Sequence, residues 1–506
     1  MRRRVGVALA TAGLLAGLLA GCTDSDDEAT PTTPPAPGSA NTVPMPRASS
    51  IDWGDCPEGR AYECGTLSVP IDYTDPDGAK IDIALLRAKA KGGERIGTLV
   101  VNPGGPGGSG ISFARYAASA FPENVRERYD IVGFDPRGVG RSAPVECLSD
   151  ADMDAYTQLD QTPDTPAEET ALVDGFTRFG SGCQADAAPL LAHVGTADAA
   201  RDMDQIREAL DEEQLRYFGA SYGTYLGAVY AELFPNRVGR FVLDGGIDPN
   251  QTAAVANRVQ GGGFQTALNS YIDDCLAGGS CYLGATREAA LARIQAFLAE
   301  LDARPLPGDA KRQVTESIAT TGILSPLYTS EQWPRLTLAL QAAFRGDGSL
   351  LLDLSDTYYE RGADGEYANL MYANAAVNCL DYPPSATTPE QVRPQIAEFE
   401  QASPTFGRTL AWAGLACGTW PIPATGRPHE IHAPGAAPIL VIGTTRDPAT
   451  PYAWSQALAG QLDSARLLTY DGDGHTAYLR GSTCVDSAVD TYLLTGALPP
   501  DGKTCD

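Results

Sequence analysis

The sequence is poor in positive charge and in metal-binding patterns. Its 506 residues include 37 Lys and Arg against 64 Asp and Glu, so the net charge at pH 7 is −27. A chain this acidic repels phosphate backbones, and we therefore expect no nucleic-acid partner. No Cys-x-x-Cys or His-x-x-x-His spacing occurs in the sequence. We therefore expect no metal centre and no cofactor.

Repeats and long heptad runs are also missing, which argues against a solenoid or a coiled coil. Hydrophobic residues make up 43% of the chain, enough to bury a large core and to exclude wholesale disorder. The length allows two or three domains, or one large core with insertions.

The N-terminal segment predicts export. Three arginines at positions 2–4 precede 17 uncharged residues, 5–21, a pattern typical of a signal peptide and short for a membrane span. The segment ends in Leu19-Ala20-Gly21-Cys22, which resembles a bacterial lipobox. We expect residues 1–21 to be a lipoprotein signal peptide and Cys22 to carry a lipid anchor, with ordinary secretion as the alternative. The protein would then lie on the outer face of the bacterial cell membrane, attached only through Cys22, or in the medium.

The cysteines agree with an oxidising compartment. Eleven are present, and ten remain after Cys22, an even number. Since they fall in local couples along the chain, we expect five disulfides: Cys56–Cys64, Cys147–Cys183, Cys275–Cys281, Cys379–Cys417 and Cys484–Cys505.

Strand patterns alternate with longer helical patterns from about Ile51 onward. This alternation predicts an α/β fold with a mainly parallel sheet and flanking helices. The best strand candidates are 81–86, 97–102, 129–134, 215–219, 240–244, 437–443 and 465–470.

Nearly 190 residues separate the strand candidate that ends at residue 244 from the next one. They contain helical patterns, such as 287–301, 331–344 and 389–401, and so predict an inserted helical cap. We divide the chain into a Pro/Thr/Asp-rich linker at 22–50, a first core part at 51–250, the cap at 251–430 and a second core part at 431–506.

The strongest chemical motif is Gly219-Ala220-Ser221-Tyr222-Gly223, which lies between a strand and a helical pattern. A G-x-S-x-G sequence in that context predicts a nucleophile elbow, in which the serine stands clear of the sheet on a sharp turn. The following helix start favours developing negative charge. We therefore expect Ser221 to be a nucleophile.

A nucleophilic serine needs a base, and the chain has only four histidines. His193 precedes the serine in a helical segment, and His429 and His432 lie at the end of the cap. His475 follows the last strand candidate in a glycine-rich loop, which favours it as the base.

A carboxylate must orient that histidine. Asp447 follows the strand candidate 437–443 and gives the chain order Ser, Asp, His of α/β-hydrolases. Asp244 and Asp473 are competitors, and an ion pair with Arg446 is the alternative role for Asp447.

A glycine loop, residues 102–110, follows another strand candidate and reads Asn-Pro-Gly-Gly-Pro-Gly-Gly-Ser-Gly. Such a loop can turn N–H groups toward an oxyanion, with the Tyr222 N–H as a second donor. A nucleotide site is the alternative, but no Gly-Lys-Ser/Thr and no suitably placed ribose-binding acid follow the loop.

These motifs, together with the segment Gly133-Phe134-Asp135-Pro136-Arg137-Gly138, resemble exported actinobacterial tripeptidyl aminopeptidases. This family of α/β-hydrolases is related to prolyl aminopeptidases, and the resemblance runs from about residue 51 to the C-terminus. It implies the α/β-hydrolase fold and a serine exopeptidase that releases short peptides from substrates with a free N-terminus. Ser221, His475 and Asp447 would form the triad, and Gly105 would supply the first oxyanion donor. Pro103 replaces the histidine of the family's His-Gly-Gly-Pro-Gly.

An aminopeptidase must also bind the substrate ammonium, which calls for a carboxylate. Asp381 is our candidate, with Asp364 and Glu366 as weaker choices. A helix-ending structural role is the alternative for Asp381. For the whole protein, the alternatives are a carboxylesterase or lipase with the same triad, and a non-catalytic surface lipoprotein.

Overall fold

The computed structural model describes residues 45–506 of the chain. The predicted signal peptide, Cys22 and most of the predicted linker lie outside the described residues. Within 45–506, no helix is both long enough and apolar enough to cross a bilayer.

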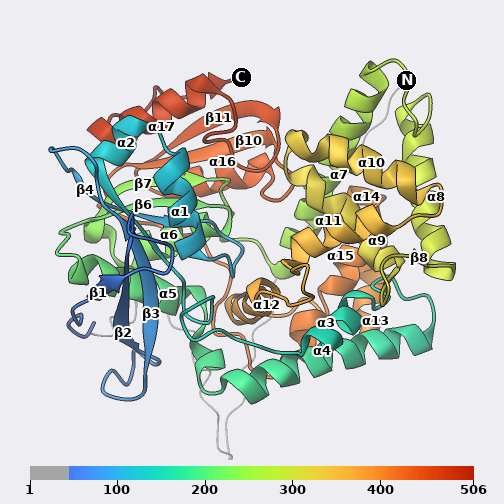
Figure 1. The fold of residues 1–506 in the computed structure, drawn as a ribbon, viewed down its shortest axis with the longest axis horizontal. Coiled ribbons are helices and arrows are strands. Elements are labelled where there is room, and N and C mark those ends of the chain that lie inside the picture. The colour runs from blue at the N-terminus through green and yellow to red at the C-terminus, as the bar shows by residue number, and fades with distance from the viewer. Residues whose placement is uncertain (1–44) are drawn as a thin grey trace, which may run out of the picture. The chain divides into compact units, whose positions relative to one another are not determined.

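Ten strands form one sheet in the order β1-β2-β3-β5-β4-β6-β7-β10-β11-β12 (Figure 1). The first three strands pair antiparallel with their neighbours, and from β5 to β12 every pairing is parallel. The mainly parallel sheet is therefore confirmed. The strands are β1 (Asp52–Asp55), β2 (Glu63–Pro70), β3 (Lys80–Ala88), β4 (Gly97–Asn102), β5 (Tyr129–Phe134), β6 (Leu215–Ala220), β7 (Val238–Asp244), β10 (Ile439–Arg446), β11 (Ala465–Asp473) and β12 (Thr504–Cys505).

Helices cover both faces of the sheet, because alternate residues of each strand point to opposite sides. In β4, Leu99 and Val101 belong to the buried cluster that includes residues of α1, α2 and α17, whereas Val100 belongs to the one that includes residues of α5, α6 and α16. All three side chains are fully buried. The six flanking helices are α1 (Gly110–Ala120), α2 (Glu123–Arg128), α5 (Thr196–Ala209), α6 (Tyr222–Leu233), α16 (Tyr452–Gln461) and α17 (Thr483–Thr495).

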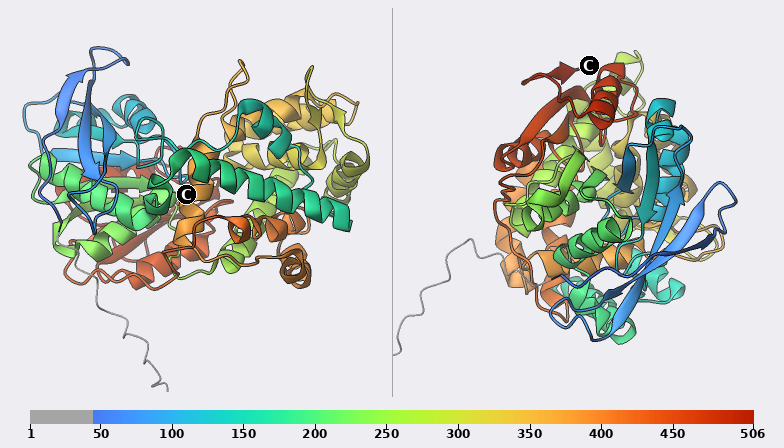
Figure 2. Two further views of the ribbon diagram at one scale, coloured as in Figure 1. Left: turned by 90° about the horizontal axis from the view of Figure 1, so that it is seen from below. Right: turned by 90° about the vertical axis from the view of Figure 1, so that its left-hand side faces the viewer.

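The chain between β7 and β10 is helical apart from a two-stranded pair, β8 (Leu306–Pro307) and β9 (Gln313–Val314). Most of these helices surround a hydrophobic core of their own, built from residues such as Leu268, Ile294 and Leu340. Figures 1 and 2 show them gathered beside the sheet. They are α7 (Ala253–Ala277), α8 (Arg287–Ala303), α9 (Glu316–Leu324), α10 (Trp333–Ala343), α11 (Ser349–Tyr359), α12 (Leu370–Asp381), α13 (Pro389–Val392), α14 (Ile396–Ala402) and α15 (Gly407–Ala413).

Two helices from before the elbow, α3 (Asp150–Thr157) and α4 (Pro166–Ala187), also extend toward this helical part. Leu172 and Phe176 of α4 pack with Val392, Phe399 and Trp412. The described residues, 45–506, belong to one compact unit, so the division at residues 250 and 430 stays a prediction.

Most predicted elements are present. The predicted strands 97–102 and 129–134 match β4 and β5 at both ends, and the helical pattern 287–301 lies within α8. The pattern 389–401 is instead divided into α13, a 3₁₀ turn (Arg393–Gln395) and α14. Pro394 lies in that turn and cannot donate a helical hydrogen bond.

All five expected disulfides are present: Cys56–Cys64, Cys147–Cys183, Cys275–Cys281, Cys379–Cys417 and Cys484–Cys505.

Candidate active site

Ser221 lies at the turn between β6 and α6, as the motif predicts. Its backbone has φ 54° and ψ −125°, a conformation that non-glycine residues rarely adopt. The turn is held by the Ser221 N–H, which donates to the Asp244 carbonyl at 2.8 Å, and by Thr224, whose N–H donates to the Ser221 carbonyl at 2.8 Å. A Cβ at position 219 would lie 2.4 Å from the Gly223 carbonyl oxygen, so the glycine is required there.

His475 and Asp447 form a direct contact above neighbouring strands. The imidazole Nδ1 lies 2.9 Å from Asp447 Oδ1 and 3.0 Å from Oδ2. The Asp447 side chain is completely buried and accepts further hydrogen bonds from the N–H groups of Ala449, Thr450 and Thr476. These donors fix the carboxylate, and an Nδ1–H that donates to it leaves Nε2 free to take a proton.

The competing carboxylates have other partners. Asp244 accepts from the N–H groups of Ala477 and Tyr478, just after His475, and burial raises its pKa to about 6. Arg446 pairs with Asp471 at 2.8 Å and Asp473 at 3.0 Å. The alternative of an Arg446–Asp447 ion pair is therefore not realised.

The other three histidines lie beside other acids. His193 is 3.6 Å from Asp198, and exposed His432 is 3.7 Å from Glu430. His429 contacts Glu232, which raises the pKa of the imidazole to about 9.

The three predicted triad residues come from the ends of β6, β10 and β11, which are close neighbours in the sheet. The space around Gly245 shows how closely the segment after β7 packs against the segments that carry Thr450 and His475. A Cβ there would lie 2.9 Å from Thr450 Oγ1 and 3.4 Å from His475 Cε1.

The glycine loop lies directly against the elbow. A Cβ on Gly104, whose φ is 95°, would lie 2.9 Å from Ser221 Cβ and 3.0 Å from the Tyr222 nitrogen. The Gly104 N–H itself is used, because it donates to Asn102 Oδ1 at 2.9 Å. Within residues 45–506, the N–H groups of Gly105 and Tyr222 have no acceptor, so both remain available to an oxyanion.

The Asp135 segment holds this loop from the other side. Asp135 accepts from the Ser109 hydroxyl at 2.6 Å and from the Ile111 N–H at 3.2 Å, where α1 begins. Arg137, fully buried, makes two hydrogen bonds of 2.7 Å to Asp202. Both side chains therefore have structural partners.

Asp381 ends α12 and is 5% exposed. Its two oxygens accept from Thr196, one from the N–H at 2.9 Å and one from the hydroxyl at 2.5 Å. The same hydroxyl lies 2.5 Å from the Tyr222 hydroxyl. Burial raises the pKa of Asp381 to about 7. The structure thus links Asp381 to the elbow residue Tyr222, and its predicted ammonium-binding role stays a prediction. The weaker choices, Asp364 and Glu366, lie in an exposed turn.

Two further neighbours of His475 were missed at the sequence level. Thr450 Oγ1 lies 3.1 Å from Asp447 Oδ2 and 3.3 Å from His475 Nδ1. The Tyr328 carbonyl accepts from the His475 N–H at 2.7 Å, and the two rings meet edge to face at 5.5 Å. The Asp-x-x-Thr spacing could have indicated Thr450, whereas a backbone carbonyl leaves no signal in a sequence.

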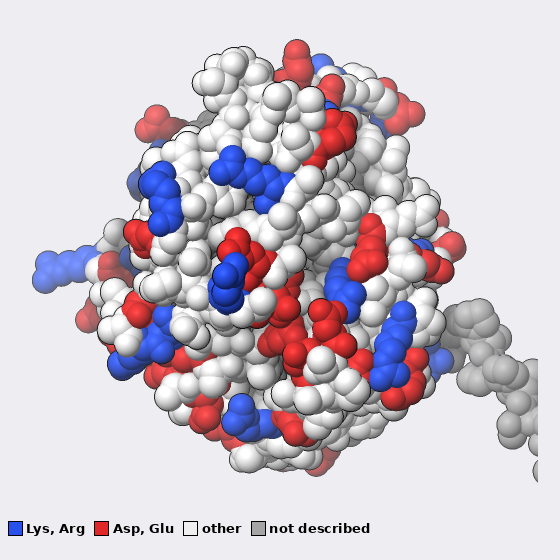
Figure 3. All heavy atoms as spheres, turned by 90° about the vertical axis from the view of Figure 1, so that its right-hand side faces the viewer, with Lys and Arg blue, Asp and Glu red and all other residues white. Residues whose placement is uncertain are grey.

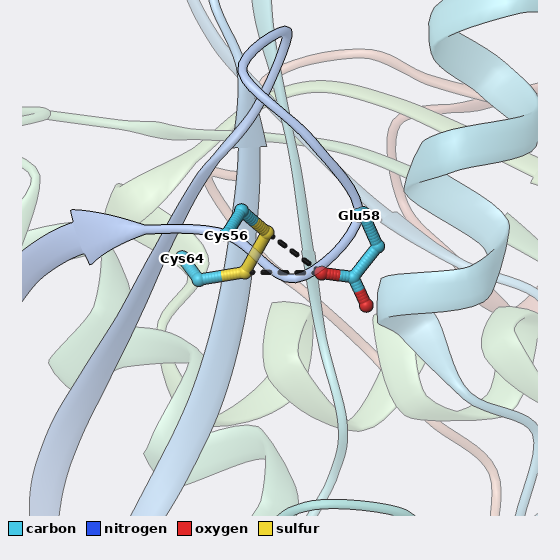
Figure 4. A group of neighbouring side chains, drawn as sticks. All are labelled: Cys56, Glu58 and Cys64. Atoms are coloured by element: carbon cyan, nitrogen blue, oxygen red, sulfur yellow. Dashed lines mark hydrogen bonds between the residues drawn. A yellow bond between two sulfur atoms is a disulfide. The ribbon is translucent and has the colours of Figure 1, made fainter.

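Two groups of side chains in the described chain have the spacing of metal ligands. The first is Cys56, Glu58 and Cys64 (Figure 4), but both sulfurs belong to a disulfide and offer no thiolate. The second is Asp160, Asp302 and Glu316, where burial raises the pKa of all three carboxyls. Figure 3 shows acidic side chains gathered near the middle of one face.

Comparison with known proteins agrees with this geometry. Residues 403–505 match the family described as TAP-like protein. The chain is 40% identical over 455 aligned positions to serine protease Hip1 of Mycobacterium tuberculosis, covering 87% of each protein. It is 39% identical to carboxylesterase B of the same species, covering 100% of this chain and 98% of the relative. It is 34% identical to the tripeptidyl aminopeptidase of Streptomyces coelicolor, covering 93% of this chain and 88% of the relative.

The sheet, the elbow and these relatives lead to one assignment. The chain is a serine hydrolase with the α/β-hydrolase fold, and it belongs to the TAP-like family that includes the tripeptidyl aminopeptidases and serine protease Hip1.

Proposed function

We propose that this protein is an exported serine exopeptidase that releases short peptides, most often tripeptides, from free N-termini. The observation that carries the proposal is the hydrogen bond from His475 to the buried Asp447 carboxylate beside the Ser221 elbow. The relatives named serine protease and tripeptidyl aminopeptidase support a peptide substrate.

Each residue then has a defined step. Ser221 Oγ attacks the scissile carbonyl while His475 Nε2 takes its proton, and Asp447 stabilises the imidazolium that forms. The N–H groups of Gly105 and Tyr222 donate to the developing oxyanion. His475 returns the proton to the leaving amine, which leaves the released peptide as an acyl group on Ser221. Water activated by His475 then hydrolyses that ester.

A carboxylesterase that uses the same triad is the second candidate. The full-length relative named carboxylesterase B favours it, and the acyl-enzyme chemistry is the same. The two candidates differ in whether the enzyme needs a substrate ammonium.

Paired substrates with and without a free amine distinguish the exopeptidase from the esterase. We would compare a free-amine tripeptide anilide with its N-acetylated twin and with a simple acyl ester, using Ser221→Ala as the blank. Hydrolysis of the free amine alone, lost in Ser221→Ala, would support the exopeptidase. Equal turnover of both anilides, or turnover of the ester only, would support the esterase.

Export through a lipoprotein signal is part of the proposal. The five disulfides support folding in an oxidising compartment. Mass analysis of the mature N-terminus should find a lipid-modified Cys22, and Cys22→Ser should release the enzyme from membranes. An unmodified residue 22 in the mature protein would contradict the anchor.

A further inference from the structure

Helix α12 lies where the predicted cap meets the sheet (Figure 1), and it contacts two different segments beside the Ser221 elbow. One is the glycine loop, which contains Gly105. The other is the start of α5, which contacts the side chain of Tyr222. The mechanism proposed above uses the N–H groups of Gly105 and Tyr222 as oxyanion donors, so one helix is connected to both of them.

The first contact of α12 is with the glycine loop. Asn374, inside the helix, donates from Nδ2 to the Pro106 carbonyl at 3.1 Å. A Cβ on Gly107, whose φ is 102°, would clash with the Leu370 carbonyl and lie 3.2 Å from the Asn374 nitrogen. The loop can therefore pack this closely on the helix only as glycine. Because Pro106 directly follows Gly105, these contacts hold the loop one residue away from the proposed oxyanion donor.

The second contact of α12 is with the first residue of α5. Both oxygens of Asp381, the last residue of α12, accept hydrogen bonds from Thr196, at 2.9 and 2.5 Å. The N-cap of α5 is Gly195, which has no side chain, so Asp381 supplies the carboxylate at this helix start. The Thr196 hydroxyl also lies 2.5 Å from the Tyr222 hydroxyl. The end of α12 is thus connected to Tyr222 through a single hydroxyl.

This connection keeps all its hydrogen bonds in either protonation state of Asp381. When the carboxyl is ionised, the Thr196 hydroxyl donates to it and the Tyr222 hydroxyl donates to Thr196. When the carboxyl is protonated, both bonds can reverse direction and both contacts remain. All three side chains are buried, so bulk water does not compete for them.

The last turn of α12 is itself held in place. Cys379, two residues before Asp381, forms a disulfide with Cys417. The N–H groups of Thr425 and Gly426 donate to the Leu380 carbonyl at 2.9 and 2.8 Å. The turn that presents Asp381 to Thr196 is therefore fixed to other segments of the chain.

We propose that α12, through Asn374 and through the Asp381–Thr196 pair, positions the N–H groups of Gly105 and Tyr222 and so sets the geometry of the oxyanion hole. Asn374 acts through the glycine loop and Thr196 acts through Tyr222, so these are positioning residues. The inference rests on the proposed acyl transfer at Ser221, and it applies to peptide and ester substrates alike.

The test measures kcat and KM of the full-length enzyme on a free-amine tripeptide anilide and on an acyl ester, with Ser221→Ala as the blank. Thr196→Val removes the hydroxyl that contacts Tyr222 at nearly constant volume, and Asn374→Leu removes the bond to the glycine loop. Loss of an oxyanion donor costs about 10²- to 10³-fold in kcat, so a displaced donor should cost about tenfold, with KM changed by less than about twofold. Both substrates should be affected equally. Thr196→Ser should restore most of the activity.

A boronic acid inhibitor gives a readout that a general loss of stability would not move. It forms a tetrahedral adduct with a nucleophilic serine, and this adduct needs the same donors as the transition state. Its inhibition constant should rise by the factor by which kcat/KM falls. Tyr372→Phe is the matched control on the same helix, because it removes only the hydroxyl that donates to the Leu148 carbonyl at 3.3 Å. It should change neither value.

Asp381→Asn separates this role from ammonium binding. A carboxamide can keep both contacts to Thr196 and should retain most of the activity on both substrates. A loss in Asp381→Asn that is confined to the free-amine substrate would overturn the inference. Wild-type kcat in Thr196→Val and Asn374→Leu, or a lower melting temperature without weaker boronic acid binding, would overturn it too. Activity that survives in Ser221→Ala would instead overturn the proposed function.

Discussion

The backbone N–H of His475 donates to the carbonyl of Tyr328 at 2.7 Å, so the loop that carries the predicted base is attached to the cap. A Cβ on Gly474 would lie 3.2 Å from the same carbonyl oxygen, which shows how closely the two segments pack. The position of the imidazole therefore depends on the position of the 3₁₀ turn Ser325–Tyr328.

Replacing the Tyr328 ring should lower turnover. Tyr328→Leu removes the edge-to-face contact with His475, which is worth about 0.5–1.5 kcal/mol for aromatic pairs. We expect kcat to fall by about two- to tenfold with little change in KM, measured on the ester and the tripeptide anilide. Tyr328→Phe keeps the ring and should retain nearly full activity. Equal losses in both variants would contradict a role for the ring.

Asp447 should be far more important than the nearby Asp473. In Asp447→Asn the carboxamide cannot stabilise an imidazolium, and kcat should fall by about 10⁴-fold, as in other serine triads. Asp473→Asn removes only a partly exposed ion pair with Arg446 and should stay within about threefold. Steady-state kinetics on one substrate decide between them, and the reverse order would reassign the third triad member.

Thr450 should assist the Asp447–His475 pair. Thr450→Val keeps the shape but removes the hydroxyl that lies 3.1 Å from Asp447 and 3.3 Å from His475. Loss of one hydrogen bond should reduce kcat by about three- to tenfold, and Thr450→Ser should restore most of it. A pH–rate profile of the Val variant that superimposes on the wild type, with no loss in kcat, would refute this role.

Asp381 should make stability depend on pH. Burial raises its pKa from 3.8 to about 7, so in that range the folded protein holds a proton that the unfolded chain has lost. The free energy of unfolding should therefore fall as pH rises from about 4 to about 7. Urea unfolding at three pH values should show a smaller fall for Asp381→Asn, with exposed Asp364→Asn as the control. An identical slope in Asp381→Asn and the wild type would show that Asp381 is not the group responsible.

The disulfides should differ in their contribution to stability. Cys379–Cys417 closes a loop with a separation of 38 residues, and Cys275–Cys281 one of only 6. Loop-closure entropy predicts losses of about 4 and about 2 kcal/mol when each pair is replaced by serines. Urea unfolding measures the stability loss of each variant. Separately, mass analysis of the intact mature enzyme should find no free thiol among the ten cysteines. Two or more free thiols would contradict the five pairings.

The strength of the local sequence pattern determined which strands of the fold could be predicted. β4 and β5 are short buried strands, and their apolar residues mark both ends of each strand. β2 was missed because it is half-exposed and contains a glycine and a terminal proline, and β1 and β12 are short edge strands. Edge strands bury little, and so they leave weak patterns.

The geometry of the candidate site was predictable to a similar extent. The turn at Ser221 was predictable because a strand, a tight turn and a helix are all encoded within a few residues. Chain order and strand ends selected Asp447 and His475, which the structure places in contact, while their catalytic roles stay a prediction. The contact of Tyr328 with His475 joins segments 147 residues apart, and no local pattern specifies it.

The long chain between the elbow and the base has a consequence for synthesis. His475 follows Ser221 by 254 residues, and the whole cap, on which the His475 loop rests, lies between them. A nascent chain that has emerged only as far as the cap contains Ser221 but not the proposed base. With His475 as the proposed base, activity can begin only when β11 has joined the sheet, so the growing polypeptide is inactive while it is being made.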